Sequence, residues 1–138
     1  MLSGNYSLAQ CFEFEKRKLI AAGMPELAAK VNWHREDEVN RTPGWDITSY
    51  NMQGHEIFIE VKASEGKVIS DVELTVNEWT EAKKCLENDK YFIYLVTDVF
   101  SKHPALESIL NPAKLVNKNI LNLKIARYQL QLSNTEVR

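Results

Sequence analysis

The stretch that decides the fold is residues 44–62, GWDITSYNMQGHEIFIEVK. At its two ends lie short runs rich in β-branched and aromatic residues, which are typical of strands. Between these runs, Gly54 suits the left-handed position of a three-residue hairpin loop. The stretch therefore predicts a β-hairpin in which Asn51 pairs with His55.

This hairpin register places two carboxylates opposite each other. Counting back from the turn pairs Asp46 with Glu60, and residues directly opposite in an antiparallel pair share a face, with Cβ atoms roughly 5 Å apart. Lys62 lies two residues beyond Glu60 and so points to the same face. Like charges placed so close repel each other unless a positive charge lies between them, and a divalent metal ion is the simplest such charge. We therefore expect Asp46 and Glu60 to bind a metal ion, with the Val61 carbonyl as a third oxygen ligand.

The length and composition indicate one globular domain. The chain has 138 residues, 44% of them apolar, and we assign residues 1–138 to a single domain. No apolar run approaches the roughly 18 residues of a membrane span, and the first residues lack the features of a signal peptide. The two cysteines are too few for a disulfide scaffold. We expect a cytoplasmic protein that does not enter a membrane.

The charge is distributed unevenly. The formal net charge of -2 argues against an overtly basic nucleic-acid binder. Residues 101–138 hold six Lys or Arg against two Glu, a net of +4, and residues 1–100 hold the other eleven against seventeen acids, a net of -6. Two interpretations stay open, an ordinary mixed surface and an acidic metal site beside a basic strip that meets phosphates. The candidate phosphate contacts are Lys114, Lys118, Lys124 and Arg127.

Helices and further strands are expected around the hairpin. The expected elements are a helix over 7–22, a helical turn and strand over 27–33, a strand over 68–74, a helix over 75–87 with a capping box, a buried strand over 91–97, a helical turn over 105–110 and a last strand over 120–132. The helix over 75–87 should cross over to bring the buried strand beside a partner. A sheet with an antiparallel middle and helices packed on it is an α/β sandwich.

Four motifs carry a resemblance to a known family. They are GWDI at 44–47, IEVK at 59–62, LTVNEWTEA at 74–82 and YFIYLV at 91–96. In this order they resemble the PD-(D/E)XK nuclease superfamily and, within it, the domain named after the C-terminal part of the plant protein NO VEIN. The resemblance covers about residues 8–100. Trp45 replaces the Pro of the superfamily's Pro-Asp and leaves Asp46 intact.

The resemblance implies a fold and an activity. The implied fold is a restriction-endonuclease-like mixed sheet with an antiparallel central hairpin flanked by helices. The implied activity is a Mg²⁺- or Mn²⁺-dependent DNA endonuclease of a restriction or phage-defence system, with Asp46, Glu60 and Lys62 as catalytic residues. The products would carry 5′-phosphate and 3′-hydroxyl ends. Similar domains accompany ATPases, helicases or restriction proteins. Because no phosphate-binding loop is present here, any motor would be a separate polypeptide or a removed portion.

Some alternatives stay open at this point. Glu15 shares the apolar face of its helix, so it is either an additional catalytic acid or a boundary carboxylate paired with a nearby Lys or Arg. The histidines are expected at the surface, and the tryptophans in packing. The alternative functions are a Holliday-junction resolvase, which would act as a homodimer, and a non-catalytic nucleic-acid or protein-docking module of the same fold.

Overall fold

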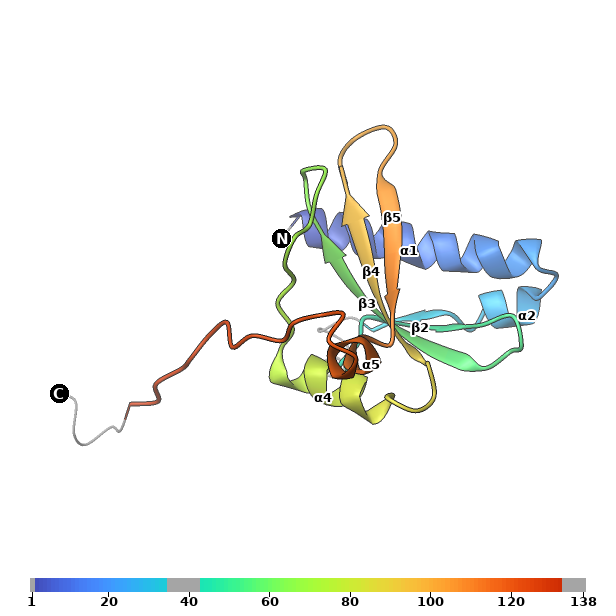
Figure 1. The fold of residues 1–138 in the computed structure, drawn as a ribbon. Coiled ribbons are helices and arrows are strands. Elements are labelled where there is room, and N and C mark those ends of the chain that lie inside the picture. The colour runs from blue at the N-terminus through green and yellow to red at the C-terminus, as the bar shows by residue number, and fades with distance from the viewer. Residues whose placement is uncertain (1, 35–42, 133–138) are drawn as a thin grey trace.

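A computed structural model describes residues 2–34 and 43–132, which form a five-stranded mixed sheet with helices on both faces (Figure 1). The strands lie across the sheet in the order β1-β2-β3-β4-β5. The elements are α1 (Leu2–Ala21), α2 (Pro25–Ala28), β1 (Asn32–Trp33), β2 (Ile47–Tyr50), β3 (Glu56–Ala63), α4 (Val76–Lys84), β4 (Tyr91–Thr97), β5 (Ala105–Leu110) and α5 (Pro112–Asn117). The α/β class expected from the sequence is confirmed.

The central hairpin has the predicted register. Strands β2 and β3 are antiparallel, with Ile47 opposite Ile59. At the turn, the Asn51 N–H donates to the His55 carbonyl at 2.9 Å. Gly54 has a φ of 84°, the left-handed conformation that a residue without Cβ adopts at little cost. The turn therefore fixes which side chains of β2 and β3 share a face.

Helix α4 makes the predicted crossover. It connects β3 to β4, which are parallel neighbours with Glu60 beside Ile93. At its start, the Thr75 side chain accepts from the Glu78 N–H and the Glu78 side chain accepts from the Thr75 N–H, so the capping box is confirmed. Strand β4 spans the predicted residues 91–97.

The core lies on both faces of the sheet. One cluster packs under α1 and the other packs under α4. Buried members of the α1 cluster include Cys11, Leu19, Ile47, Ile57, Ile59, Val61, Tyr94 and Val96. Buried members of the α4 cluster are Ala82, Cys85, Tyr91 and Ile93. Because β3 alternates between the two clusters, its even-numbered side chains point to the α4 face.

Three predicted elements differ in the structure. Residues 68–74 were predicted as a strand but belong to no strand, and residues 120–132, the predicted last strand, also pair with no neighbour. Residues 105–110, the predicted helical turn, instead form β5, which pairs antiparallel with β4. In each case the local pattern allows a strand, and the position of β4 decides which segment pairs.

Helix α5 was not predicted. Asn111 and Pro112 resemble the end of an element, but here they begin one. The Asn111 side chain accepts from the Lys114 N–H, and Pro112 occupies the first turn, where its missing N–H costs no hydrogen bond.

Candidate functional site

The two predicted carboxylates meet where β2 begins. Asp46 lies one residue before β2, and Glu60 lies within β3. The ladder ends with Ile47 opposite Ile59, so Asp46 lies just beyond its end, next to Glu60 in the neighbouring strand. Their carboxyl groups lie close enough to share a hydrogen bond. The structure thus brings these two acids together on one face.

The end of the β2–β3 ladder fixes Asp46. Its N–H donates to the Ile59 carbonyl at 2.8 Å, and its Oδ2 accepts from the Val61 N–H at 2.8 Å. The Val61 N–H is thus bound by a side-chain oxygen of Asp46 and not by a backbone carbonyl of the neighbouring strand. Because the N–H and C=O of one strand residue point to the same side, the Val61 carbonyl is directed toward the edge where Asp46 lies.

Burial and nearby negative charge raise the pKa values of both carboxyl groups. Glu60 is 3% exposed, and burial, with the charges of Asp46 and Glu78, raises its pKa to about 9. Burial also raises the pKa of Asp46, although its hydrogen bond from Val61 acts in the opposite direction. Two facing carboxyl groups with raised pKa values hold a proton between them at neutral pH.

Lys62 lies between two acidic side chains on the α4 face. Its Nζ is 3.1 Å from Glu60 Oε2 and 3.3 Å from Glu78 Oε1. Burial by itself lowers the pKa of Lys62, but the charges of the adjacent Glu60 and Glu78 side chains and their hydrogen bonds outweigh it and raise the pKa above its usual value. The ammonium group therefore stays charged beside the carboxyl pair.

Glu78 lies beside these residues, although the sequence pattern favours a capping role for it over a functional one. Its Oε1 accepts from the Thr75 N–H at 3.0 Å and from Lys62 Nζ at 3.3 Å. A signal was present in the sequence, because a helix that crosses over between two parallel strands packs on one face of the sheet and can bring its side chains to that face. The cap of α4 thus holds the Glu78 carboxylate against Lys62.

Glu15 is not brought together with these residues. It is fully buried on α1, where Lys18 Nζ, Ser49 Oγ and Tyr94 Oη donate to its carboxylate at 2.5, 2.7 and 2.6 Å. Tyr94 belongs to the α1 cluster, whereas Glu60 points to the α4 face. This arrangement favours the paired carboxylate over the additional catalytic acid.

Gly44 allows α4 to pack against the turn that presents Asp46. Its φ is 106°, and a Cβ added there would lie 2.4 Å from Glu81 Cγ. The Tyr91 hydroxyl donates to the Gly44 carbonyl at 2.7 Å. Close approach of the helix and this buried hydrogen bond together fix the backbone just before Asp46.

The aromatic side chains near the site take part in packing. Trp45 stacks on Phe58 with ring centroids 3.8 Å apart, and its Nε1 donates to Thr48 Oγ1 at 2.8 Å. Lys90 Nζ lies 4.4 Å from the centroid of the Phe58 ring. Trp45 is thus a partly buried packing residue, as the sequence predicts for the tryptophans.

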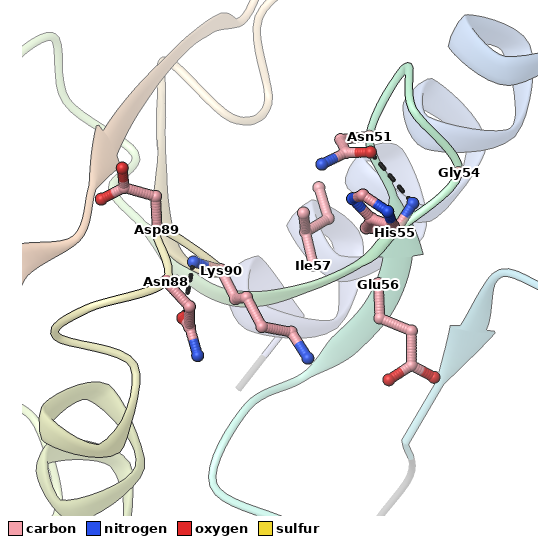
Figure 2. A pocket seen from close by; sticks show the side chains of 8 residues that line it. All are labelled: Asn51, Gly54, His55, Glu56, Ile57, Asn88, Asp89 and Lys90. Atoms are coloured by element: carbon pink, nitrogen blue, oxygen red, sulfur yellow. Dashed lines mark hydrogen bonds between the residues drawn. The ribbon is translucent and has the colours of Figure 1, made fainter.

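The candidate ligands are two carboxylates and a backbone oxygen. Within residues 2–34 and 43–132, no group of three or more His, Cys, Asp or Glu side chains is placed to hold a metal ion. A pocket of about 530 Å³ lies elsewhere, between the β2–β3 turn and the loop before β4 (Figure 2). Figure 2 shows His55 and Lys90 lining this pocket, and neither Glu60 nor Lys62 contributes to it.

The fold and these side chains define a class: a mixed α/β domain with two facing carboxyl groups and a lysine on one face of the sheet. Residues 9–109 match the family described as Protein NO VEIN, C-terminal, and the chain belongs to this family. Comparison with curated proteins and with solved structures gives no significant match. In the part of the chain that the structure describes, no helix has the length and apolar character needed to cross a membrane.

Proposed function

We propose that the chain is a metal-dependent DNA endonuclease with a PD-(D/E)XK-type fold, acting in restriction or phage defence. The observation that supports this most strongly is the Lys62 ammonium, 3.1 Å from Glu60 on the face where Glu60 meets Asp46. Hydrolysis of a phosphodiester needs this combination, oxygen ligands for a divalent cation and a fixed positive charge. The antiparallel hairpin followed by a parallel crossover strand agrees with the fold that the motifs imply.

The donor set fits Mg²⁺ or Mn²⁺. Magnesium prefers oxygen ligands and keeps several waters, so one or two protein carboxylates are enough. Asp46, Glu60 and the Val61 carbonyl would hold the ion, which when bound activates a water and offsets charge on the phosphate. Both carboxyl groups must be ionised as ligands, so the shared proton is released on loading.

Lys62 supplies positive charge that is in place before the reaction. Because its flanking carboxylates keep it protonated, it serves as an electrostatic stabiliser or orients the attacking water, and does not accept a proton. Glu78 holds the ammonium on the face shared with Glu60. A charge positioned in advance needs no reorganisation as negative charge develops on the phosphate oxygens.

Cleavage assays with Lys62→Ala test the proposal. Wild type and variant are incubated with plasmid, single-stranded and four-way junction DNA, with Mn²⁺ or with EDTA. Lys83→Ala serves as the control because Lys83 is an exposed lysine on α4. We expect cutting only with Mn²⁺, a single-turnover rate about 100-fold or more lower in Lys62→Ala, and a wild-type rate in the control. An unchanged rate in Lys62→Ala refutes the role of this lysine.

Calorimetry separates metal binding from catalysis. Asp46→Asn should lose the Mn²⁺ site, while the asparagine oxygen can still accept from the Val61 N–H and preserve the turn. Lys62→Ala should bind Mn²⁺ and DNA almost as wild type does, because a group that acts on the transition state changes rate more than affinity. Normal Mn²⁺ binding by folded Asp46→Asn contradicts the proposed ligand set.

Two observations favour a second candidate, a non-catalytic docking module of the same fold. Lys62 is already engaged by two carboxylates, and the described residues provide no cluster of three side-chain ligands. Such a module binds nucleic acid or protein but leaves every DNA substrate uncut in Mg²⁺ and Mn²⁺. Symmetric cutting of the four-way junction by a dimer would instead identify a Holliday-junction resolvase.

A further inference from the structure

The segment after α5 exposes more apolar surface than an ordinary surface segment does. Residues 121–132 belong to no helix or strand, and Figure 1 shows them running away from the sheet and its helices. The large exposed side chains here are Leu123 (57%), Ile125 (74%), Tyr128 (87%), Leu130 (88%) and Leu132 (66%). So many adjacent exposed apolar residues indicate a surface that another surface covers.

The sequence of this segment is that of a strand. Tyr128, Leu130 and Leu132 alternate with Gln129 and Gln131, the two-residue period that gives an apolar face and a polar face. Extended at about 3.3 Å per residue, residues 121–132 are long enough to run along a full strand. The segment therefore has the pattern of a strand but lacks a sheet to join.

Strand β5 offers the complementary feature. It is the last strand of the sheet, so its outer edge has no neighbour among the described residues. Unpaired N–H and C=O groups along such an edge accept an added strand. Leu110 at the end of β5 is 43% exposed, and Glu107 in its middle is also exposed. The positive charge of Lys124 in the segment complements Glu107.

The path of the segment leads away from its own β5. Helix α5 ends with the Ile120 N–H donating to the Leu115 carbonyl. Arg127 then forms an ion pair with Glu73 at 2.8 Å, in the segment that precedes α4. Figure 1 shows the chain leaving α5 and continuing away from the sheet, so that it does not run along β5. Because the segment does not reach the β5 edge of its own chain, a second copy can supply that edge.

We propose that residues 121–132 add as a strand to the outer edge of β5 in a second copy of this chain. Two copies related by a two-fold axis each donate one segment and each accept one, so the interface closes as a dimer. The apolar side of the segment would lie beside Leu110 and extend the sheet by one strand in each copy. This inference does not depend on the proposed nuclease activity.

The first experiment measures the oligomeric state of the full chain. Light scattering over a range of concentrations is compared for wild type, Leu130→Lys/Leu132→Lys and Gln129→Lys/Gln131→Lys. The two variants add the same charge to the same segment but on opposite faces. We expect a wild-type dimer, a near-normal dimer for the glutamine variant, and a dissociation constant about 100-fold or more higher for the leucine variant, the ratio expected from two buried leucines.

The second experiment identifies what the segment contacts. A photo-crosslinking amino acid at Tyr128 is introduced into isotope-labelled chain, which is mixed with unlabelled chain before irradiation. We expect crosslinks from labelled Tyr128 to unlabelled residues 105–110. The proposal is overturned by a wild-type monomer at all concentrations, by a dimer that tolerates Leu130→Lys/Leu132→Lys, or by crosslinks confined to one chain. Circular dichroism melts confirm that each variant is folded.

Discussion

The protonated carboxyl pair leads to a quantitative prediction for Glu60→Gln in the metal-free protein. Folding raises the pKa of Glu60 from its ordinary value of 4.5 to about 9. An acid whose pKa is raised by folding destabilises the folded state as pH rises above the unfolded value, and the effect is complete only above the folded value. Between pH 4.5 and pH 7 this cost grows by about 1.4 kcal/mol per pH unit, to roughly 3 kcal/mol. Glutamine resembles neutral Glu60 and does not ionise.

Because Asp46 shares the proton with Glu60, roughly 3 kcal/mol is an upper limit. In EDTA we expect Glu60→Gln to come close to wild type near pH 5 and to exceed its free energy of unfolding by about 1–3 kcal/mol at pH 7. Urea denaturation at several pH values measures this, and Glu65→Gln, at an exposed position, is the control. Excess Mg²⁺ should make wild type the more stable of the two proteins, because only wild type retains both carboxylate ligands. A stability difference that does not change between pH 5 and pH 8 would refute the reasoning.

Two further substitutions test the surroundings of the site. Gly44→Ala should lower the free energy of unfolding by about 1–3 kcal/mol, because the φ of 106° disfavours alanine and the new Cβ meets Glu81. Thermal melts measure this loss, with Gly66→Ala as the control. Equal melting temperatures for the two variants would contradict the prediction. Glu15→Gln should lower the free energy of unfolding by about 1–3 kcal/mol, because it weakens the buried hydrogen bonds from Ser49 and Tyr94. The variant should still bind Mn²⁺ with wild-type affinity in calorimetry. Loss of Mn²⁺ binding by the folded variant would place Glu15 among the catalytic acids.

The hairpin and its carboxylates could be predicted because turn and register are local properties. Gly54 fixes the loop, and the two-residue period of a strand then determines which side chains share a face. One count from the turn was enough to bring Asp46 next to Glu60, although the regular ladder ends one residue earlier. Strand β4 could be predicted for another reason, because a strand buried on both faces is a nearly continuous apolar run.

The C-terminal part could not be predicted because its local patterns are ambiguous. Residues 105–110 suit a helical turn as well as a strand, and only the long-range pairing with β4 makes them β5. Residues 120–132 have the alternation of a strand, but they pair with no strand among residues 2–34 and 43–132. In the proposed dimer, the β5 edge of the second copy supplies the strand that this alternation requires. The alternating pattern then reflects pairing between two chains and not pairing within one chain.

Glu78 could have been placed in the site by topology, and its identity carries a further argument. A glutamine would complete the capping box with Thr75 equally well. Only a glutamate also offsets the charge of Lys62, 3.3 Å away. With Asp46, Glu60 and Glu78 ionised and Lys62 protonated, this face carries three negative charges and one positive charge. The remaining two negative charges match one divalent cation in magnitude, so Glu78, in the first turn of α4, also sets the charge that the candidate site presents to a metal ion.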